Sequence, residues 1–271
     1  MTPGYLLFDI GATETRLAYA HTARSFEAPL IVPTDPRVNG FDRVIEHMRA
    51  VVAGRPVKQV AGGLAGSIDR KQGRMLRAPN LPLWNGLEFT KIVRHEFKAP
   101  VRLENDTAVV GLGEASNGAG RGADIMVYLT FSTGVNGVRV VDGRIDRSCH
   151  GFDIGYQIMG LRGGGTTSLE DMVGGHNLQR RYGKTPKAIA MTSAWYEIER
   201  AVVAGIYNTN LYWSPERIVI GGGLSHDMDV KRLKHLLAEF PPVFDHWPEL
   251  ELATLGDVGG LHGALQLANQ S

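Results

Sequence analysis

The sequence predicts a mixed α/β protein that folds as two lobes. Apolar strands alternate with stretches of helical spacing along all 271 residues, and 43% of the residues are hydrophobic. A unit of strand, threonine- and glycine-containing turn, and returning strand occurs twice, at residues 9–16 and 130–139. We therefore expect an N-terminal lobe over residues 1–117, completed by a C-terminal helix at 259–271, and a second lobe over residues 118–258.

The first lobe begins with a hairpin. An apolar strand over residues 5–9 leads into a turn that contains Gly11, and a second strand follows over residues 16–20. Further along, apolar spacing predicts a helix at 44–52, a buried strand at 57–64, a helix at 88–97, a strand at 101–104 and a helix of small residues from Asp106.

The second lobe begins in the same way. A strand over residues 125–131, a turn and a returning strand over 135–141 precede an Asp142–Gly143 turn. The remaining pattern predicts helices at 168–182, 190–212, 229–240 and 259–268, and a buried strand at 217–220 that ends in three glycines.

Charge and cysteine content exclude several classes of protein. The net charge of +1 favours neither a nucleic-acid nor a membrane partner, and no apolar run approaches the ~20 residues that span a bilayer. Cys149 is the single cysteine, so neither a disulfide within the chain nor a cysteine-built zinc site is available. We expect a cytoplasmic protein, because the first residues also lack the pattern of a signal peptide.

The first turn combines residues that suit a metal ion and a phosphate. Asp9 ends an apolar strand, and Gly11 and Thr13 follow it. A carboxylate can bind a divalent cation, while backbone N–H groups and a threonine hydroxyl can contact phosphate oxygens. The same residues also fit an ordinary hairpin with a polar turn, so both interpretations stay open.

A second polar cluster, Glu104–Asn105–Asp106, separates a strand from a helix. Either Asn105 or Asp106 suits the N-cap of that helix. Alternatively, Asp106 accepts the proton of a sugar hydroxyl and Asn105 hydrogen-bonds a neighbouring hydroxyl.

Two glycine-containing turns in the second lobe suit a nucleotide. Thr133 and Gly134 form a second candidate phosphate turn, and Gly222 and Gly223 follow a buried strand, where an adenosine could lie against bare backbone. Tight turns without a ligand are the alternative for both segments.

The order of these segments resembles the ROK family of sugar kinases and sugar-responsive repressors. The resemblance extends from about Leu7 to Ser225 and includes Ala78–Leu81, Glu104–Asp106 and the glycines at 221–223. It implies a two-lobed actin-like (ribonuclease H-like) fold with an interlobe cleft. It also implies a homodimeric glucokinase- or N-acetylhexosamine kinase-like enzyme, with Mg-ATP as donor and the 6-hydroxyl of a hexose or N-acetylhexosamine as acceptor.

The resemblance also assigns roles to single residues. Asp106 is expected to be the catalytic base, and Asp9 to bind Mg²⁺ through ATP. The residues expected to contact the sugar are Asn80, Asn105, Asp106, Asp153, Tyr156 and Glu170, and those expected near the nucleotide are Asp9, Gly11, Thr13, Thr133, Gly134, Gly222 and Gly223.

The sequence departs from the family pattern in both phosphate turns. Ala12 stands where the family has a second glycine, and Ser132 and Asn136 depart from its glycine-rich second turn. An added Cβ could crowd a phosphate there, but it costs little where φ is negative.

Further departures affect the sugar and zinc motifs. Asp153 and Tyr156 replace a glutamate and a histidine, and glycines and threonines at 163–167 replace a cysteine-rich loop. Tyrosine is a poor zinc ligand, so we expect no structural zinc. Glu170 fits either a sugar ligand or the capping box of Thr167–Ser168–Leu169–Glu170. A non-catalytic sugar-binding protein and a kinase that uses polyphosphate as donor remain alternatives.

Overall fold

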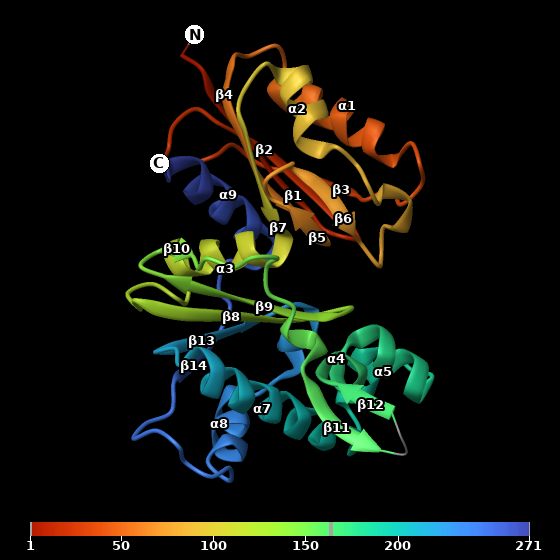
Figure 1. Cartoon of the computed structure of the whole chain (residues 1–271), viewed down its shortest axis with the longest axis vertical. Helices are drawn as coiled ribbons and strands as arrows, with labels where there is room; N and C mark the ends of the chain where they lie inside the picture. Colours follow the sequence, from red (N-terminus) through yellow and green to blue (C-terminus); the bar gives the residue numbers. More distant parts are fainter. Residues whose placement is uncertain (1, 163–164, 271) are drawn as a thin grey trace. The chain divides into compact units, whose positions relative to one another are not determined.

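A computed structural model describes residues 2–162 and 165–270. The chain divides into two compact units (Figure 1). The first comprises Met1–Gly118, Arg147–Gly151 and Leu255–Ser271, and the second comprises Ala119–Asp146 and Phe152–Thr254. The segment Arg147–Gly151 therefore belongs to the first unit, whereas the sequence expectation placed it in the second.

The first unit is built on a five-stranded sheet. Its strand order is β3 (Leu30–Pro33), β2 (Glu14–Ala20), β1 (Gly4–Ile10), β4 (Val57–Leu64) and β7 (Val101–Asn105). Strands β1, β2 and β3 are antiparallel neighbours, whereas β1, β4 and β7 run parallel. The carboxyl ends of the three parallel strands therefore meet at one edge.

Alternation along β1 decides which side chains enter the core of this unit. Leu6, Phe8 and Ile10 are buried with the helices α1 (Gly40–Val52) and α2 (Phe89–Phe97). Asp9 points to the opposite face, because successive side chains of a strand alternate. That face packs against α3 (Asp106–Asn117) and α9 (Gly259–Asn269), and Figure 1 shows α9 on the other side of the sheet from α1 and α2.

A small hairpin, β5 (Ser67–Asp69) and β6 (Arg74–Arg77), follows β4. The sequence pattern did not reveal it, because each strand buries a single side chain, Ile68 or Met75. A 3₁₀ turn at Pro82–Trp84 then leads to α2.

The second unit repeats the strand order of the first. Its sheet runs β10 (Arg144–Ile145), β9 (Val135–Val141), β8 (Ile125–Phe131), β13 (Arg217–Gly221) and β14 (Glu249–Leu252). Its three leading strands are antiparallel, and β8, β13 and β14 are parallel. The repeated strand–turn–strand unit is confirmed as the first hairpin of each sheet.

The helices of the second unit are shorter than the apolar spacing predicted. They are α4 (Leu169–Val173), α5 (Gly175–Tyr182), α6 (Pro186–Ala190), α7 (Ala194–Trp213) and α8 (Val230–Leu237). The prediction of one helix over 168–182 was wrong, because Gly174 adopts an extended conformation between α4 and α5. A hairpin of β11 (Ile158–Arg162) and β12 (Gly165–Ser168) precedes α4. No helix within residues 2–162 and 165–270 has the length and apolarity that crossing a membrane requires.

Candidate active site

Asp9 provides a buried carboxylate at the carboxyl end of β1. Only 6% of the residue is exposed, and its ion-pair partner is Arg16, whose Nη1 lies 4.0 Å from Oδ2. Burial raises the pKa of Asp9 to about 7, the charge of Asp106 adds to the rise, and Arg16 opposes it. Among the described residues no hydrogen bond reaches this carboxylate, so a bound cation would relieve its desolvation.

Glycines on two neighbouring elements make room for the two carboxylates. Gly63 is the sheet partner of Asp9 on β4, and a Cβ added there would lie 2.7 Å from the Cα of Asp106. A Cβ added to Gly260, on α9, would lie 2.3 Å from the Cγ of Asp9. The structure shows that these glycines let β4 and α9 approach the acidic residues closely.

Asp106 is the first residue of α3, directly after β7. Its Oδ1 accepts a hydrogen bond from the N–H of Thr107 at 2.8 Å. Burial raises the pKa of Asp106, although hydrogen bonds from Thr107 and Asn105 oppose the rise. A carboxylate with a raised pKa binds a proton more readily, so Asp106 is suited to general-base chemistry.

Asn105 is the N-cap of α3, which confirms one of the two structural interpretations. Its Oδ1 accepts from the N–H of Ala108 at 3.3 Å, and its Nδ2 donates to the carbonyl oxygen of Gly66 at 3.1 Å. A carboxamide has two N–H groups and two lone pairs on oxygen. Asn105 therefore fixes the start of α3 and, because its side chain also hydrogen-bonds Asp106, retains only an acceptor site for a ligand.

Arg16 was overlooked by sequence reasoning. It lies opposite Asp9 in the β1–β2 register, and its Nη2 donates to Glu14 at 2.6 Å and to Asp257 at 3.2 Å. Its buried Nε has no hydrogen-bond partner among residues 2–162 and 165–270. No sequence pattern could reveal this residue, because Asp257 is 241 positions away.

The turn between β1 and β2 is closed by backbone hydrogen bonds. The N–H of Gly11 donates to Glu14 O at 2.9 Å, and the hydroxyl of Thr34 donates to Gly11 O at 2.8 Å. Thr13 is exposed, and its carbonyl accepts from the N–H of Thr34. Ala12 is absent from the described residues that have a positive φ, so its Cβ adds no backbone strain.

The turn between β8 and β9 is fixed to the start of α5. The N–H of Gly175 donates to Ser132 O at 2.8 Å, and the N–H of His176 donates to Thr133 O at 3.0 Å. Thr133 itself is exposed. Ser132 and Asn136 also avoid positive φ within the described chain, so the departures from glycine in this turn are sterically tolerated.

Glu170 supports this second turn instead of capping a helix. Its Oε2 accepts from the N–H of Val135 at 2.8 Å, and a Cβ added to Gly134 would lie 2.6 Å from the same oxygen. The capping box of α4 is formed by Ser168 and Asp171. The capping interpretation of Glu170 was therefore wrong by one residue.

Gly222 and Gly223 follow β13, and Gly222 lies against the end of β8, where the turn between β8 and β9 begins. Gly222 has φ +86°, and a Cβ there would lie 2.4 Å from Phe131 O and 2.6 Å from Thr130 Oγ1. Gly223 is exposed, with nothing within 4 Å of an added Cβ. A flat ligand could approach Gly223 without meeting a side chain.

The remaining predicted sugar-contacting residues are on the surface. Asn80 is exposed in the loop of the first unit that precedes Pro82–Trp84. In the second unit, Asp153 and Tyr156 are exposed on either side of the buried Gly155. A Cβ at Gly155 would lie 2.1 Å from Val135 O, so Asp153 and Tyr156 flank a segment that packs on β9.

The structure thus brings predicted residues together within each unit. Asp9 and Asp106 are neighbours in the first unit; Gly134 and Glu170 adjoin in the second, where Gly222 packs on the end of β8. The predicted loop glycines 163 and 164 lie outside the described residues. Among residues 2–162 and 165–270, no group of three or more His, Cys, Asp or Glu side chains is placed to hold a metal ion.

The Asp9 carboxylate fits a magnesium ion that is held together with a nucleotide. It has no hydrogen-bond donor among the described residues, and the Nη1 of Arg16 lies 4.0 Å from it. With only two neighbouring carboxylates in the first unit, the phosphate oxygens of a nucleotide would have to supply most ligands of a magnesium ion.

Several curated relatives of the chain are sugar kinases by name. The chain is 26% identical to a fructokinase of Zymomonas mobilis, over 95% of this chain and 94% of that protein. It is also 26% identical to a glucokinase of Halalkalibacterium halodurans, over 98% of this chain and 95% of that protein.

Solved structures share the fold. A ROK family glucokinase from Streptomyces griseus, in complex with glucose and AMPPNP, has a TM-score of 0.79 at 23% identity, and the similarity covers 99% of this chain and all of that one (100%). Lmo2764 of Listeria monocytogenes, a putative N-acetylmannosamine kinase, has a TM-score of 0.81 at 22% identity, with 98% of each chain covered. The fold is therefore the predicted two-lobed kinase fold. Because the model of the ROK family matches residues 5–271, the chain belongs to the ROK family.

Proposed function

We propose that this ROK-family chain is a sugar kinase that transfers the terminal phosphoryl group of ATP to the 6-hydroxyl of a hexose or N-acetylhexosamine. The observation that supports the proposal most strongly is the position of Asp106, a carboxylate with a raised pKa at the start of α3, beside Asp9. The names of the glucokinase and fructokinase relatives support the class of reaction.

Asp106 is the proposed base. Its carboxylate accepts the proton of the attacking hydroxyl and orients that hydroxyl. The N–H of Thr107 fixes one carboxylate oxygen, and the capping bonds of Asn105 fix the turn in which both residues lie. The second oxygen is then the proton acceptor.

Asp9 is the proposed contact to a magnesium ion. Bound Mg-ATP would supply the phosphoryl group and the cation that offsets its negative charge. In the first unit, Gly11 and Thr13 would bind phosphate oxygens. In the second unit, Thr133 and Gly134 would do the same, and Gly222 and Gly223 would contact the adenosine. Asn80, Asn105, Asp153, Tyr156 and Glu170 are proposed to contact the sugar.

The test is an ADP-release assay over a panel of hexoses and N-acetylhexosamines. The wild-type protein is expected to turn over at least one of them with Mg-ATP. Asp106→Asn is expected to reduce kcat by at least about 100-fold, because general-base catalysis typically contributes that much or more. Asp42→Asn is the matched control, since Asp42 lies in the first turn of α1 as Asp106 does in α3. Equal losses in both variants would refute the role of Asp106.

A sugar-binding protein without kinase activity is the second candidate. It is favoured by the TM-score of 0.81, at 18% identity, to a ROK family transcriptional regulator, a homologue of the E. coli MLC protein. Calorimetry separates the two candidates, because only the kinase is expected to bind Mg-ATP. Inorganic polyphosphate belongs in the donor panel, because an Arthrobacter polyphosphate/ATP-glucomannokinase shares the fold with a TM-score of 0.72.

We also propose a cytoplasmic homodimer without structural zinc. The lone Cys149 is exposed and fits a reducing compartment. Light scattering of the purified protein tests the dimer, and metal analysis of the same sample tests the absence of zinc.

A further inference from the structure

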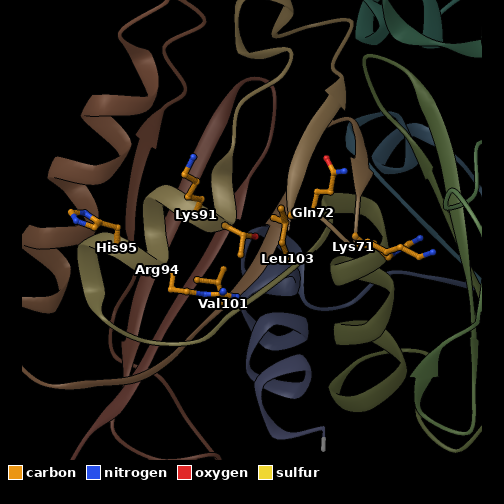
Figure 2. Close-up of a pocket in the computed structure, with 10 residues that line it drawn as sticks. Lys71, Gln72, Lys91, Arg94, His95, Val101 and Leu103 are labelled. Carbon is orange, nitrogen blue, oxygen red and sulfur yellow. The ribbon is translucent and has the colours of Figure 1, made fainter.

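A cavity of about 380 Å³ in the first unit has a strongly basic lining. Its walls come from the turn between β5 and β6, from α2 and from β7. Figure 2 shows Lys91, Arg94 and His95 extending from α2, Lys71 extending from the hairpin turn, and Val101 and Leu103 on the strand between them. The cavity differs from the candidate active site, because neither Asp9 nor Asp106 lines it.

The wall formed by the hairpin turn is fixed to the start of α2. The N–H of Thr90 donates to Gly73 O at 2.9 Å, and the N–H of Gly73 donates to Asp69 O at 2.7 Å. Gly73 has φ +65°, and a Cβ there would lie 2.1 Å from the Oγ1 of Thr90. Only glycine fits at this position, so the turn between β5 and β6 can pack directly against the start of α2.

Several cationic side chains line the cavity, and not all of them form an ion pair with a carboxylate. Within the described part of the chain, no acidic side chain lines the cavity. Arg70 pairs with Glu104 at 2.7 Å, and Lys91 pairs with Glu88 at 2.6 Å. The side chains of Lys71 and Arg94 form no ion pair or hydrogen bond with any residue that the structure describes. An anion could therefore bind these two cations without breaking an existing pair.

We propose that this cavity binds a small phosphate monoester. Arginine and lysine are the side chains that bind phosphate most strongly, and both Arg94, on α2, and Lys71, on the hairpin turn, line the cavity. Ligand-binding cavities measure about 300–1,000 Å³, so this one can accommodate an organic group together with the phosphate. Val101 and Leu103 offer an apolar surface to that group, and Gln72 and Thr90 offer neutral hydrogen-bonding groups.

This proposal concerns a site separate from the candidate active site. Because glucose 6-phosphate would also be a product of the proposed kinase reaction, the cavity variants described below decide which site binds it. Calorimetry with three probes tests it: inorganic phosphate, glucose 6-phosphate and glucose. The wild-type protein is expected to bind glucose 6-phosphate, and the affinity is expected to fall as salt rises. Tighter binding of the ester than of inorganic phosphate indicates a metabolite site. Equal affinity indicates a site for free phosphate, which overturns the monoester assignment.

Two double variants locate the binding. Lys71→Gln/Arg94→Gln removes the unpaired cations of the cavity, and Arg24→Gln/Lys234→Gln removes the same charge from exposed positions elsewhere. We expect the first variant to weaken glucose 6-phosphate binding by at least about tenfold and the second by less than about twofold. The proposal is overturned if the wild-type protein does not bind the ester, or if both variants bind it equally. Both variants are expected to fold, because all four side chains are exposed, and thermal melting checks this.

Discussion

Replacing Asp9 with asparagine is expected to stabilise the fold while abolishing activity. The pKa of Asp9 is raised to about 7 from an ordinary 3.8, because the carboxylate is buried and lies near Asp106. The folded state therefore binds the proton more tightly than the unfolded state does. As pH rises from about 4 to about 7, the carboxylate of the folded protein ionises although it is buried. The free energy of unfolding therefore falls over this range. Asparagine has the same shape without that charge.

The magnitude follows from the pKa. Each tenfold change in proton affinity corresponds to about 1.4 kcal/mol, so a rise from 3.8 to about 7 corresponds to about 4 kcal/mol at most. Asp9→Asn is expected to approach this gain in the free energy of unfolding at pH 8 and to show none of it at pH 4. Its kcat is expected to fall by at least about 100-fold, because asparagine is a weaker ligand for Mg²⁺.

Thermal melting at pH 4 and pH 8, without Mg²⁺ or nucleotide, measures the effect. Asp35 is the control of opposite sign, because its ion pair with Arg37 lowers its pKa to about 2. That carboxylate stabilises the fold above about pH 4, so Asp35→Asn is expected to lower Tm at pH 8. A lower Tm for Asp9→Asn at pH 8 would contradict this expectation, because it would show that interactions in the folded protein stabilise the ionised carboxylate of Asp9.

Three further substitutions test the packing around the candidate site. Gly222→Ala is expected to cost about 1–3 kcal/mol and to weaken Mg-ATP binding, because its Cβ meets backbone at a positive φ, whereas Gly223→Ala should leave Tm unchanged. Gly260→Ala is expected to lower Tm, because its Cβ would collide with the side chain of Asp9. Gly259→Ala should be tolerated, because the nearest atom to its Cβ lies 3.4 Å away. Glu170→Ala leaves the N–H of Val135 without its acceptor, so the free energy of unfolding should fall by about 1 kcal/mol and the KM for ATP should rise. Glu170→Gln should retain most of the stability and most of the ATP affinity, because its side-chain oxygen can still accept this hydrogen bond. Melting curves and ATP titrations would contradict these expectations if each pair of variants behaved alike.

The central strands of both sheets could be predicted from sequence because their signal is local, whereas β3, β10 and β14 were not predicted. Apolar strands that end in a polar residue and a glycine turn revealed both leading hairpins, including the position of Asp9 at the end of β1. Strands with one buried side chain, such as β5 and β6, gave no such pattern. The long predicted helix failed at Gly174, because apolar spacing continues across a residue whose backbone is extended.

The site was predictable only in part, because part of it depends on distant contacts. Asp106 and Asn105 stand out by their place between a strand and a helix. The contacts of Arg16 with Asp257 and of Gly260 with Asp9 join the two ends of the chain, so no local pattern reports them. Glu170 matched a capping box by spacing, but Asp171 is one position closer to the helix interior and takes that role.

In the proposed reaction, Asp106 accepts the proton of the sugar hydroxyl. The most direct measurement is the single-turnover rate of phosphoryl transfer by Asp106→Asn, with the sugar that the screen identifies and with Mg-ATP at saturation. Asp106→Asn is expected to react at least about 100-fold more slowly than wild type, with sugar affinity within about threefold of wild type. A rate within about threefold of wild type would contradict that role of Asp106.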